Sequence, residues 1–172
     1  MKITIINTTD IEYKNNVFSK DDLTIINTSS LKISTCLGCF DCWVKTPGKC
    51  IIKDDMDEIL RKTILADIVI YISDVLVGYI SGKLKLIHDR TLPLIHPYMD
   101  IYKGEFHHLR RYPKYPKIGL VLIEKTAEIE DEVYRLIKNS YERLALNVRS
   151  ELLFVIKDTV KLGGLKNELN HY

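Results

Sequence analysis

The stretch Ile68-Val69-Ile70-Tyr71-Ile72 decides the fold class of this 172-residue chain. It holds five apolar residues in a row and leaves no polar face, so it predicts a strand that is covered on both sides. Four further short runs are β-branched-rich and nearly continuous in the same way. They occupy residues 3–6, 23–26, 118–123 and 152–156.

Helical patterns separate these runs. One helix is expected to begin at Met56, after the acidic pair Asp54-Asp55, because apolar residues then recur with the helical period and carboxylates favour a helix start. A second is expected after an N-cap at Thr126, and a shorter one over residues 81–90. Strands that alternate with helices predict an α/β fold built on an open, doubly wound parallel sheet.

Three segments depart from this alternation. Only fifteen residues, 8–22, join the first two runs, which leaves room for a stunted helix near residues 13–19. Residues 91–117 are rich in Pro, His and Tyr and are expected to form a long excursion between the third and fourth strands, where such segments are often functional. The polar tail after Val160 is expected to be a frayed helix.

The composition indicates one ordinary globular domain over residues 1–172. Apolar residues make up 46% of the chain, charged residues 28%, and the formal net charge is +2. That charge is too small to indicate a nucleic-acid partner or an anionic membrane. No apolar run approaches a membrane span, and the first run is too short for a signal peptide. We therefore expect a cytoplasmic protein with reduced thiols.

All four cysteines lie in one short run, as Cys36, Cys39, Cys42 and Cys50. Gaps of two residues turn the chain back on itself, so the thiolates can converge on a metal centre, and three close thiolates with a fourth further on is a pattern that iron–sulfur clusters use. Zinc sites usually divide their ligands into two separated pairs. A folded loop with reduced thiols and a disulfide or redox-active pair are the other readings of the run.

The wider sequence resembles a known family. The run Cys-x-Gly-Cys-x-x-Cys-Trp-x-x-x-Pro-Gly-x-Cys, the following Lys53-Asp54-Asp55-Met56 and the segment 66–90 resemble flavodoxin-like NAD(P)H-dependent FMN reductases, and more narrowly the iron–sulfur flavoproteins. The resemblance covers about residues 1–90. It implies a flavodoxin-like three-layer α/β/α sandwich with five parallel strands in the order 2-1-3-4-5 and a shortened first helix. It also implies that the four cysteines hold a 4Fe–4S cluster.

Ligands of open α/β sheets bind beyond the carboxyl ends of the strands, at the switch point between the first and third. The resemblance implies that FMN binds there. The expected cofactor-binding residues are Thr8, Thr9, Ser73, Asp74, Val75, Leu76, Val77 and Gly78.

Two loops at this place depart from the family pattern. Residues 7–10, Asn-Thr-Thr-Asp, replace a glycine-rich loop whose following helix holds the FMN phosphate, and Asp10 would repel that phosphate. Residues 73–76, Ser-Asp-Val-Leu, replace the family's Ser-Pro-Val-Tyr, so a stiffening proline and an aromatic residue are missing.

The expected function is an FMN-dependent oxidoreductase that takes electrons from NAD(P)H, passes them to an unidentified acceptor and assembles as a homodimer or homotetramer. The sequence singles out no catalytic residue. The alternative is a flavodoxin-fold binding or scaffold protein that holds no cofactor and keeps the cysteine loop for structure. A basic cluster at His107, His108, Arg110 and Arg111 is either a phosphate site or a solvated or subunit-contact surface.

Overall fold

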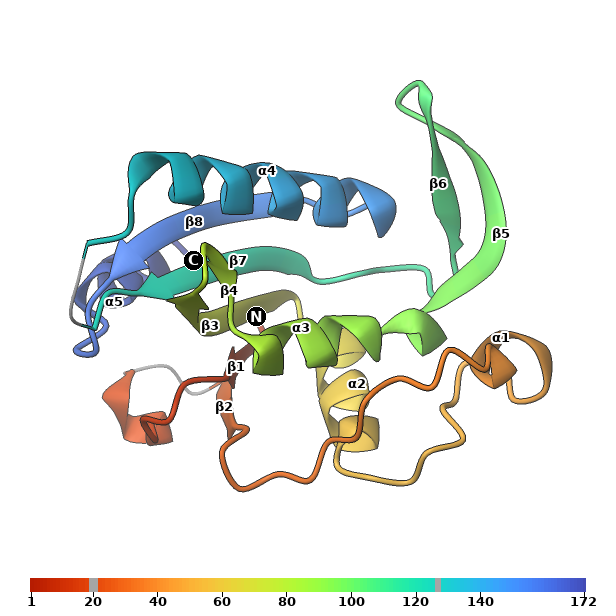
Figure 1. The fold of residues 1–172 in the computed structure, drawn as a ribbon, viewed down its shortest axis with the longest axis horizontal. Coiled ribbons are helices and arrows are strands. Elements are labelled where there is room, and N and C mark those ends of the chain that lie inside the picture. The colour runs from red at the N-terminus through yellow and green to blue at the C-terminus, as the bar shows by residue number, and fades with distance from the viewer. Residues whose placement is uncertain (19–21, 126–127) are drawn as a thin grey trace.

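The computed structural model describes residues 1–18, 22–125 and 128–172, and its centre is a parallel sheet (Figure 1). The strands lie in the order β2-β1-β3-β7-β8, and every neighbouring pair among them is parallel. This arrangement confirms the expected 2-1-3-4-5 order. The bounds of these strands are β1 Ile3–Asn7, β2 Leu23–Asn27, β3 Ile68–Leu76, β7 Lys117–Ile123 and β8 Leu152–Asp158.

Helices cover both faces of the sheet, which gives the flavodoxin-like three-layer sandwich. Helices α2 (Met56–Leu65), α3 (Gly82–Asp89) and α4 (Asp131–Asn147) share one core with Val69 and Tyr71 of β3. The other face of β3 packs against α5 (Gly163–Leu169) and the segment around the 3-10 helix η1 (Asn15–Val17). The two faces of β3 are thus both apolar and buried, as its unbroken apolar run requires.

A glycine lets the last two strands pack closely. The register between β7 and β8 shifts beside Gly119, and the ring of Phe154 lies over that glycine. A Cβ at Gly119 would come within 2.6 Å of the Phe154 Cζ, closer than packed carbons allow. The ring therefore occupies the place of a side chain at residue 119.

The first crossover is as short as expected, with η1 as its only helical turn among the described residues. Tyr13 and Phe18 nevertheless cover the sheet, since both are buried. The expected helices at Met56 and over residues 81–90 are confirmed as α2 and α3, and Ser81 caps α3 by accepting from Leu84 N–H at 3.3 Å. Thr126 lies outside the described residues; the helix after it begins at Asp131 with Glu130 as its N-cap.

The expected long excursion between the third and fourth strands is present, and it contains η2 (Leu92–Leu94) and the antiparallel hairpin β5 (Ile95–Tyr102) and β6 (Glu105–Arg110). Figure 1 shows this hairpin rising away from the sheet at the end of the molecule opposite α5. The tail forms a helix as expected, α5, but the expectation that it frays was wrong, because its leucines are buried against the core. Within the described residues, no helix is long and apolar enough to cross a membrane.

Candidate functional site

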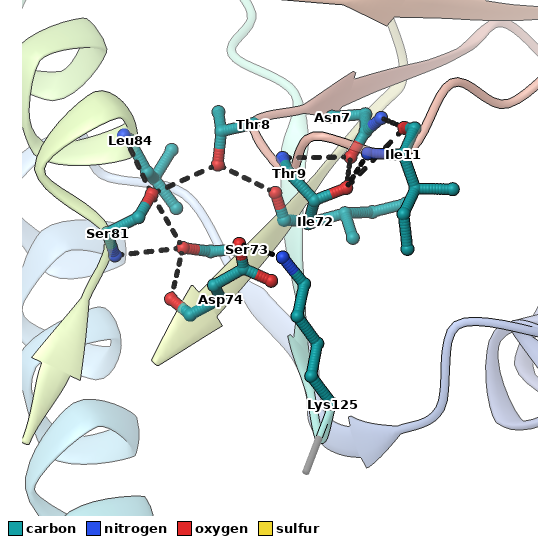
Figure 2. Close-up of polar contacts among 10 residues, drawn as sticks. All are labelled: Asn7, Thr8, Thr9, Ile11, Ile72, Ser73, Asp74, Ser81, Leu84 and Lys125. Carbon is teal, nitrogen blue, oxygen red and sulfur yellow. Dashed lines mark hydrogen bonds and ion pairs between the residues drawn. The ribbon is translucent and has the colours of Figure 1, made fainter. Parts of the chain in front are cut away.

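The expected flavin crevice begins with hydroxyl groups at the carboxyl ends of β1 and β3 (Figure 2). Thr8 Oγ1 donates to Ile72 O at 2.9 Å and lies 3.3 Å from Ser81 Oγ. Ser73 Oγ lies 3.1 Å from Ser81 Oγ and accepts from Ser81 N–H at 3.0 Å. These side chains are buried, so the structure brings Thr8 and Ser73 together by way of Ser81, which the sequence prediction did not include.

The chain after β1 is closed by its own hydrogen bonds. Thr9, also buried, donates from Oγ1 to Asn7 Oδ1 at 2.8 Å and from its backbone N–H to the same oxygen at 3.1 Å. Asn7 in turn donates to Asn27 Oδ1 at 2.9 Å, across to the end of β2. The threonine hydroxyls that were expected to meet a phosphate therefore already have protein partners.

The segment after β3 folds back as a tight hairpin. Strand β3 continues to Leu76, and β4 (Tyr79–Ile80) pairs with it antiparallel. The two residues between them, Val77 and Gly78, both have positive φ, at 52° and 74°. Two consecutive positive φ angles are the signature of the primed turns that join twisted strands. Val77 is fully exposed at the tip.

A groove of about 470 Å³ lies between this hairpin and the end of β7. Four of the expected residues line it, namely Asp74, Val75, Leu76 and Gly78. Its other wall holds Ile123, Lys125, Glu128, Ile129, Glu130 and Val133. Of the remaining expected residues, Thr8, Thr9 and Ser73 are buried and do not line the groove, and Val77 points to solvent.

The charge of the groove is mainly acidic. Lys125 Nζ donates to Asp74 Oδ2 at 2.8 Å, and Asp74 Oδ1 is buried without a hydrogen-bond partner. The hydrogen bond to Asp74, with the charges of Asp74 and Asp10, raises the pKa of Lys125 above its ordinary value. Since Glu128 and Glu130 add two more carboxylates, the groove suits an uncharged ring better than a phosphate.

The cysteine run forms a loop around the short helix α1 (Asp41–Val44). Gly38, Phe40 and Gly48 all have positive φ, which bends the chain back between the thiols. Cys36 and Cys39 are exposed, Cys50 is partly buried, and Cys42 is buried. All four are free thiols, so the disulfide reading finds no support in this structure.

The four thiols interact through their charges. Burial raises the pKa of Cys42, and the charges of Cys50, Cys36 and Cys39 raise it further. Over residues 1–18, 22–125 and 128–172, however, no three Cys, His or carboxylate side chains are preassembled as a metal-binding group. Four free thiols in one loop fit an iron–sulfur cluster in donor chemistry, and their loop would have to tighten around it.

An ion pair closes the neck of this loop. Arg90 donates from Nη1 to Asp54 Oδ2 at 2.9 Å and from Nη2 to Asp54 Oδ1 at 3.0 Å, and its Nη1 also donates to Ser34 O at 2.7 Å. Both charged side chains are buried. Burial alone would raise the pKa of Asp54, but hydrogen bonds from Arg90, Ser34 N–H and Met56 N–H outweigh it and hold the pKa low.

The sequence predicts Asp54 only at a helix start and predicts no role for Arg90. The cap is real, because Asp54 Oδ1 accepts from Met56 N–H at 3.1 Å. The bidentate pairing with Arg90, 36 positions away, is a tertiary contact, so a local sequence pattern cannot predict it.

The loop docks on the foot of the β5–β6 hairpin through Trp43. Its Nε1 donates to Leu92 O at 2.9 Å, and its ring lies 5.3 Å from that of Phe40 and 5.5 Å from that of His108. His108 Nδ1 lies 2.7 Å from His96 O, and His107 is buried. These two histidines belong to hairpin packing rather than to an open basic surface.

The comparisons with known proteins agree with this picture. No family model matches the chain. A segment of 69 residues is 44% identical to an iron–sulfur flavoprotein of Methanocaldococcus jannaschii and covers 40% of this chain and 35% of the relative. A segment of 71 residues is 39% identical to an iron–sulfur flavoprotein of Archaeoglobus fulgidus and covers 41% and 31%. The chain thus matches about a third of the length of these curated relatives.

Solved structures resemble the whole chain. An FMN-dependent NADH-azoreductase of Bacillus anthracis, solved in complex with FMN, superimposes with a TM-score of 0.63 at 13% identity and covers 99% of this chain and 97% of its own. A flavone reductase superimposes with a TM-score of 0.55 at 16% identity, covering 99% of this chain and 58% of that one. The chain has the flavodoxin-like fold of these proteins, and the resemblance of part of its sequence to iron–sulfur flavoproteins is confirmed.

Proposed function

We propose that this chain is a flavoprotein oxidoreductase domain that binds FMN at the carboxyl edge of β3 and β7 and an iron–sulfur cluster in the cysteine loop. One observation carries the proposal: a four-thiol loop, closed at its neck by Asp54 and Arg90, is built into a flavodoxin-like sheet. The names of the relatives that share part of its sequence support both cofactors.

The groove beside the β3–β4 hairpin is the proposed place for the flavin ring. Val75, Leu76 and Gly78 offer apolar and backbone contacts, and the Asp74–Lys125 pair supplies a hydrogen-bond donor and acceptors at its edge. FMN, when bound, exchanges a hydride with a nicotinamide nucleotide and single electrons with a metal centre. The role of the chain would be to hold the flavin ring, to exclude water from one side of it and to keep the cysteine loop in the same domain.

NAD(P)H as electron donor and assembly as a homodimer or homotetramer belong to the same proposal. The phosphate loop is shortened and its threonines are engaged, so this chain offers a bound flavin fewer contacts than the family pattern does. A second copy would supply the missing wall. Light scattering with and without FMN measures the assembly directly.

A second function, binding or scaffolding without a cofactor, is favoured by one specific observation. The hydroxyl groups of Thr8, Thr9, Ser73 and Ser81 are satisfied by one another, by the Asn7 side chain and by the backbone, so these four hydroxyl groups require no ligand (Figure 2). In this reading the cysteine loop serves only to dock Trp43 on η2.

An absorption spectrum of the chain purified without oxygen distinguishes the two functions. The flavoprotein proposal expects a two-banded flavin spectrum, with a broad shoulder beneath it that disappears in a Cys36→Ser, Cys39→Ser variant. A colourless protein that takes up neither added FMN nor iron and sulfide would overturn the proposal and leave the scaffold function. If NADPH or NADH bleaches the flavin bands, the nicotinamide donor is established as well.

A further inference from the structure

The residue that closes the cysteine loop is a buried cation. Arg90 follows α3 directly, and only 2% of its surface is exposed. Its partners Ser34 and Asp54 stand two residues before Cys36 and four residues after Cys50. One guanidinium therefore joins the entry and the exit of the loop to the end of α3.

One N–H donor of Arg90 has no hydrogen-bond partner. Nη1 donates to Ser34 O and Asp54 Oδ2, and Nη2 donates to Asp54 Oδ1, but Nε is buried without a hydrogen-bond partner. Such an orphaned donor is costly, and charged groups make the cost larger. An acceptor is expected nearby.

The side chain next to it is that of Cys50. Cys50, like Asp54, interacts with the Arg90 guanidinium through its side chain. A neutral thiol is a weak acceptor and a thiolate is a strong one, so the free Nε–H would bond best to Cys50 as a deprotonated ligand sulfur.

We propose that Arg90 is the positioning residue of the cysteine site, whose Nε–H donates to Cys50 Sγ when that sulfur is a ligand. This inference rests on the proposed function, because it supposes that the loop holds an iron–sulfur cluster. A hydrogen bond and a fixed positive charge at one ligand sulfur stabilise the reduced, more negative cluster and raise its reduction potential. The Asp54 carboxylate keeps the guanidinium pointed at Cys50.

Arg90→Lys distinguishes a positioning residue from one that only holds the ends of the loop together. Lys would keep the charge and one contact to Asp54, but it lacks the planar fork that can hold Asp54, Ser34 and Cys50 at once. If Arg90 only holds the ends of the loop together, Arg90→Lys would lower the stability of the protein without changing the reduction potential of the cluster. A positioning residue would change the potential itself.

The test uses the whole chain, loaded without oxygen with ferrous iron and sulfide. Potentiometric titration is expected to give reduction potentials that fall in the order wild type, Arg90→Lys, Arg90→Gln, with the exposed Arg135→Lys unchanged as the matched control. In wild type grown with guanidino-15N arginine, pulsed EPR of the reduced cluster is expected to show a 15N coupling. If the Arg90 variants fail to fold, this second measurement still tests the proposal, because the absence of any 15N coupling would overturn it.

The outcomes separate the two proposals. A wild-type chain that takes up no iron and sulfide overturns the cluster and this inference together. A loaded wild type that shows no 15N coupling, or whose potential the Arg90→Lys variant shares, overturns the inference and leaves the cluster in place.

Discussion

At the scale of single residues, the Asp54–Arg90 pair is an ion pair whose two side chains are both buried. Asp54→Asn removes the carboxylate while Arg90 stays buried, and breaking such a pair from one side costs about 3–5 kcal/mol. We expect a loss of that size in urea unfolding. In an Asp54→Asn, Arg90→Met double variant no uncompensated charge remains, so the loss should be clearly smaller than the sum of the two single losses. Additive losses would show that the pair does not act as a unit.

The lowered pKa of His88 predicts how the stability of the protein depends on pH. Burial, with a smaller contribution from Lys85, lowers its pKa from 6.5 to about 4, while Asp89 opposes the shift. The unfolded chain therefore binds more protons between these values, and stability should fall as the pH drops from 6.5 to 4, by at most about 3 kcal/mol. His88→Phe keeps the ring contact with Tyr71 and should lose this part of the slope. Parallel slopes in denaturant titrations of both proteins would contradict the assignment.

At the scale of elements, α5 shows that a short helix can be a core element. Leu162, Leu165 and Leu169 are buried, so Leu165→Ala should reduce the free energy of unfolding by about 2–5 kcal/mol. Leu136→Ala on the exposed face of α4 is the matched control and should change it by less than about 0.5 kcal/mol. Equal effects of the two changes in urea unfolding would mean that α5 does not pack on the sheet.

The reason why the sequence predicts only a frayed helix at α5 is physical. The helix begins with Gly163-Gly164, after Leu162 in a left-handed conformation, and none of these residues is a usual start signal. Asp158 provides the missing start, since its Oδ2 accepts from Leu165 N–H at 2.8 Å. A Cβ at Gly164 would come within 3.1 Å of that carboxylate oxygen, so a side chain there would crowd the hydrogen bond to Leu165 N–H.

The β3–β4 turn carries strain in an exposed position. Val77 has φ 52°, which is unfavourable for a β-branched residue, and its side chain makes no compensating buried contact. Val77→Asn suits the primed turn and should raise the free energy of unfolding by about 1 kcal/mol. Val44→Asn in α1 is the control and should have little effect. A Val77→Asn protein that is less stable than wild type in urea unfolding would contradict the assignment of strain to this turn.

At the scale of the whole molecule, the alternation of runs predicted the parallel sheet because the central strands β1, β3 and β7 are buried on both faces and therefore have nearly continuous apolar sequences. The site was less predictable. The sequence predicted that Thr8, Thr9 and Ser73 lie at the carboxyl edge of the sheet, where the structure has them. Their hydroxyl groups, however, are buried and form hydrogen bonds with Asn7, Ile72 and Ser81. Which way a hydroxyl points is decided by tertiary packing, and neither residue type nor spacing reports it.

That distribution of polar groups over the fold predicts how FMN is recognised. The groove is acidic, Asp10 lies on the same side, and no described helix of α type follows β1, so the phosphate gains little. We expect FMN and riboflavin to bind within about tenfold of each other, or about 1.4 kcal/mol, by fluorescence quenching of the flavin. Added salt should change the ratio little. A preference for FMN of a hundredfold or more would mean that residues 7–10 give up their internal hydrogen bonds and reorganise around the phosphate.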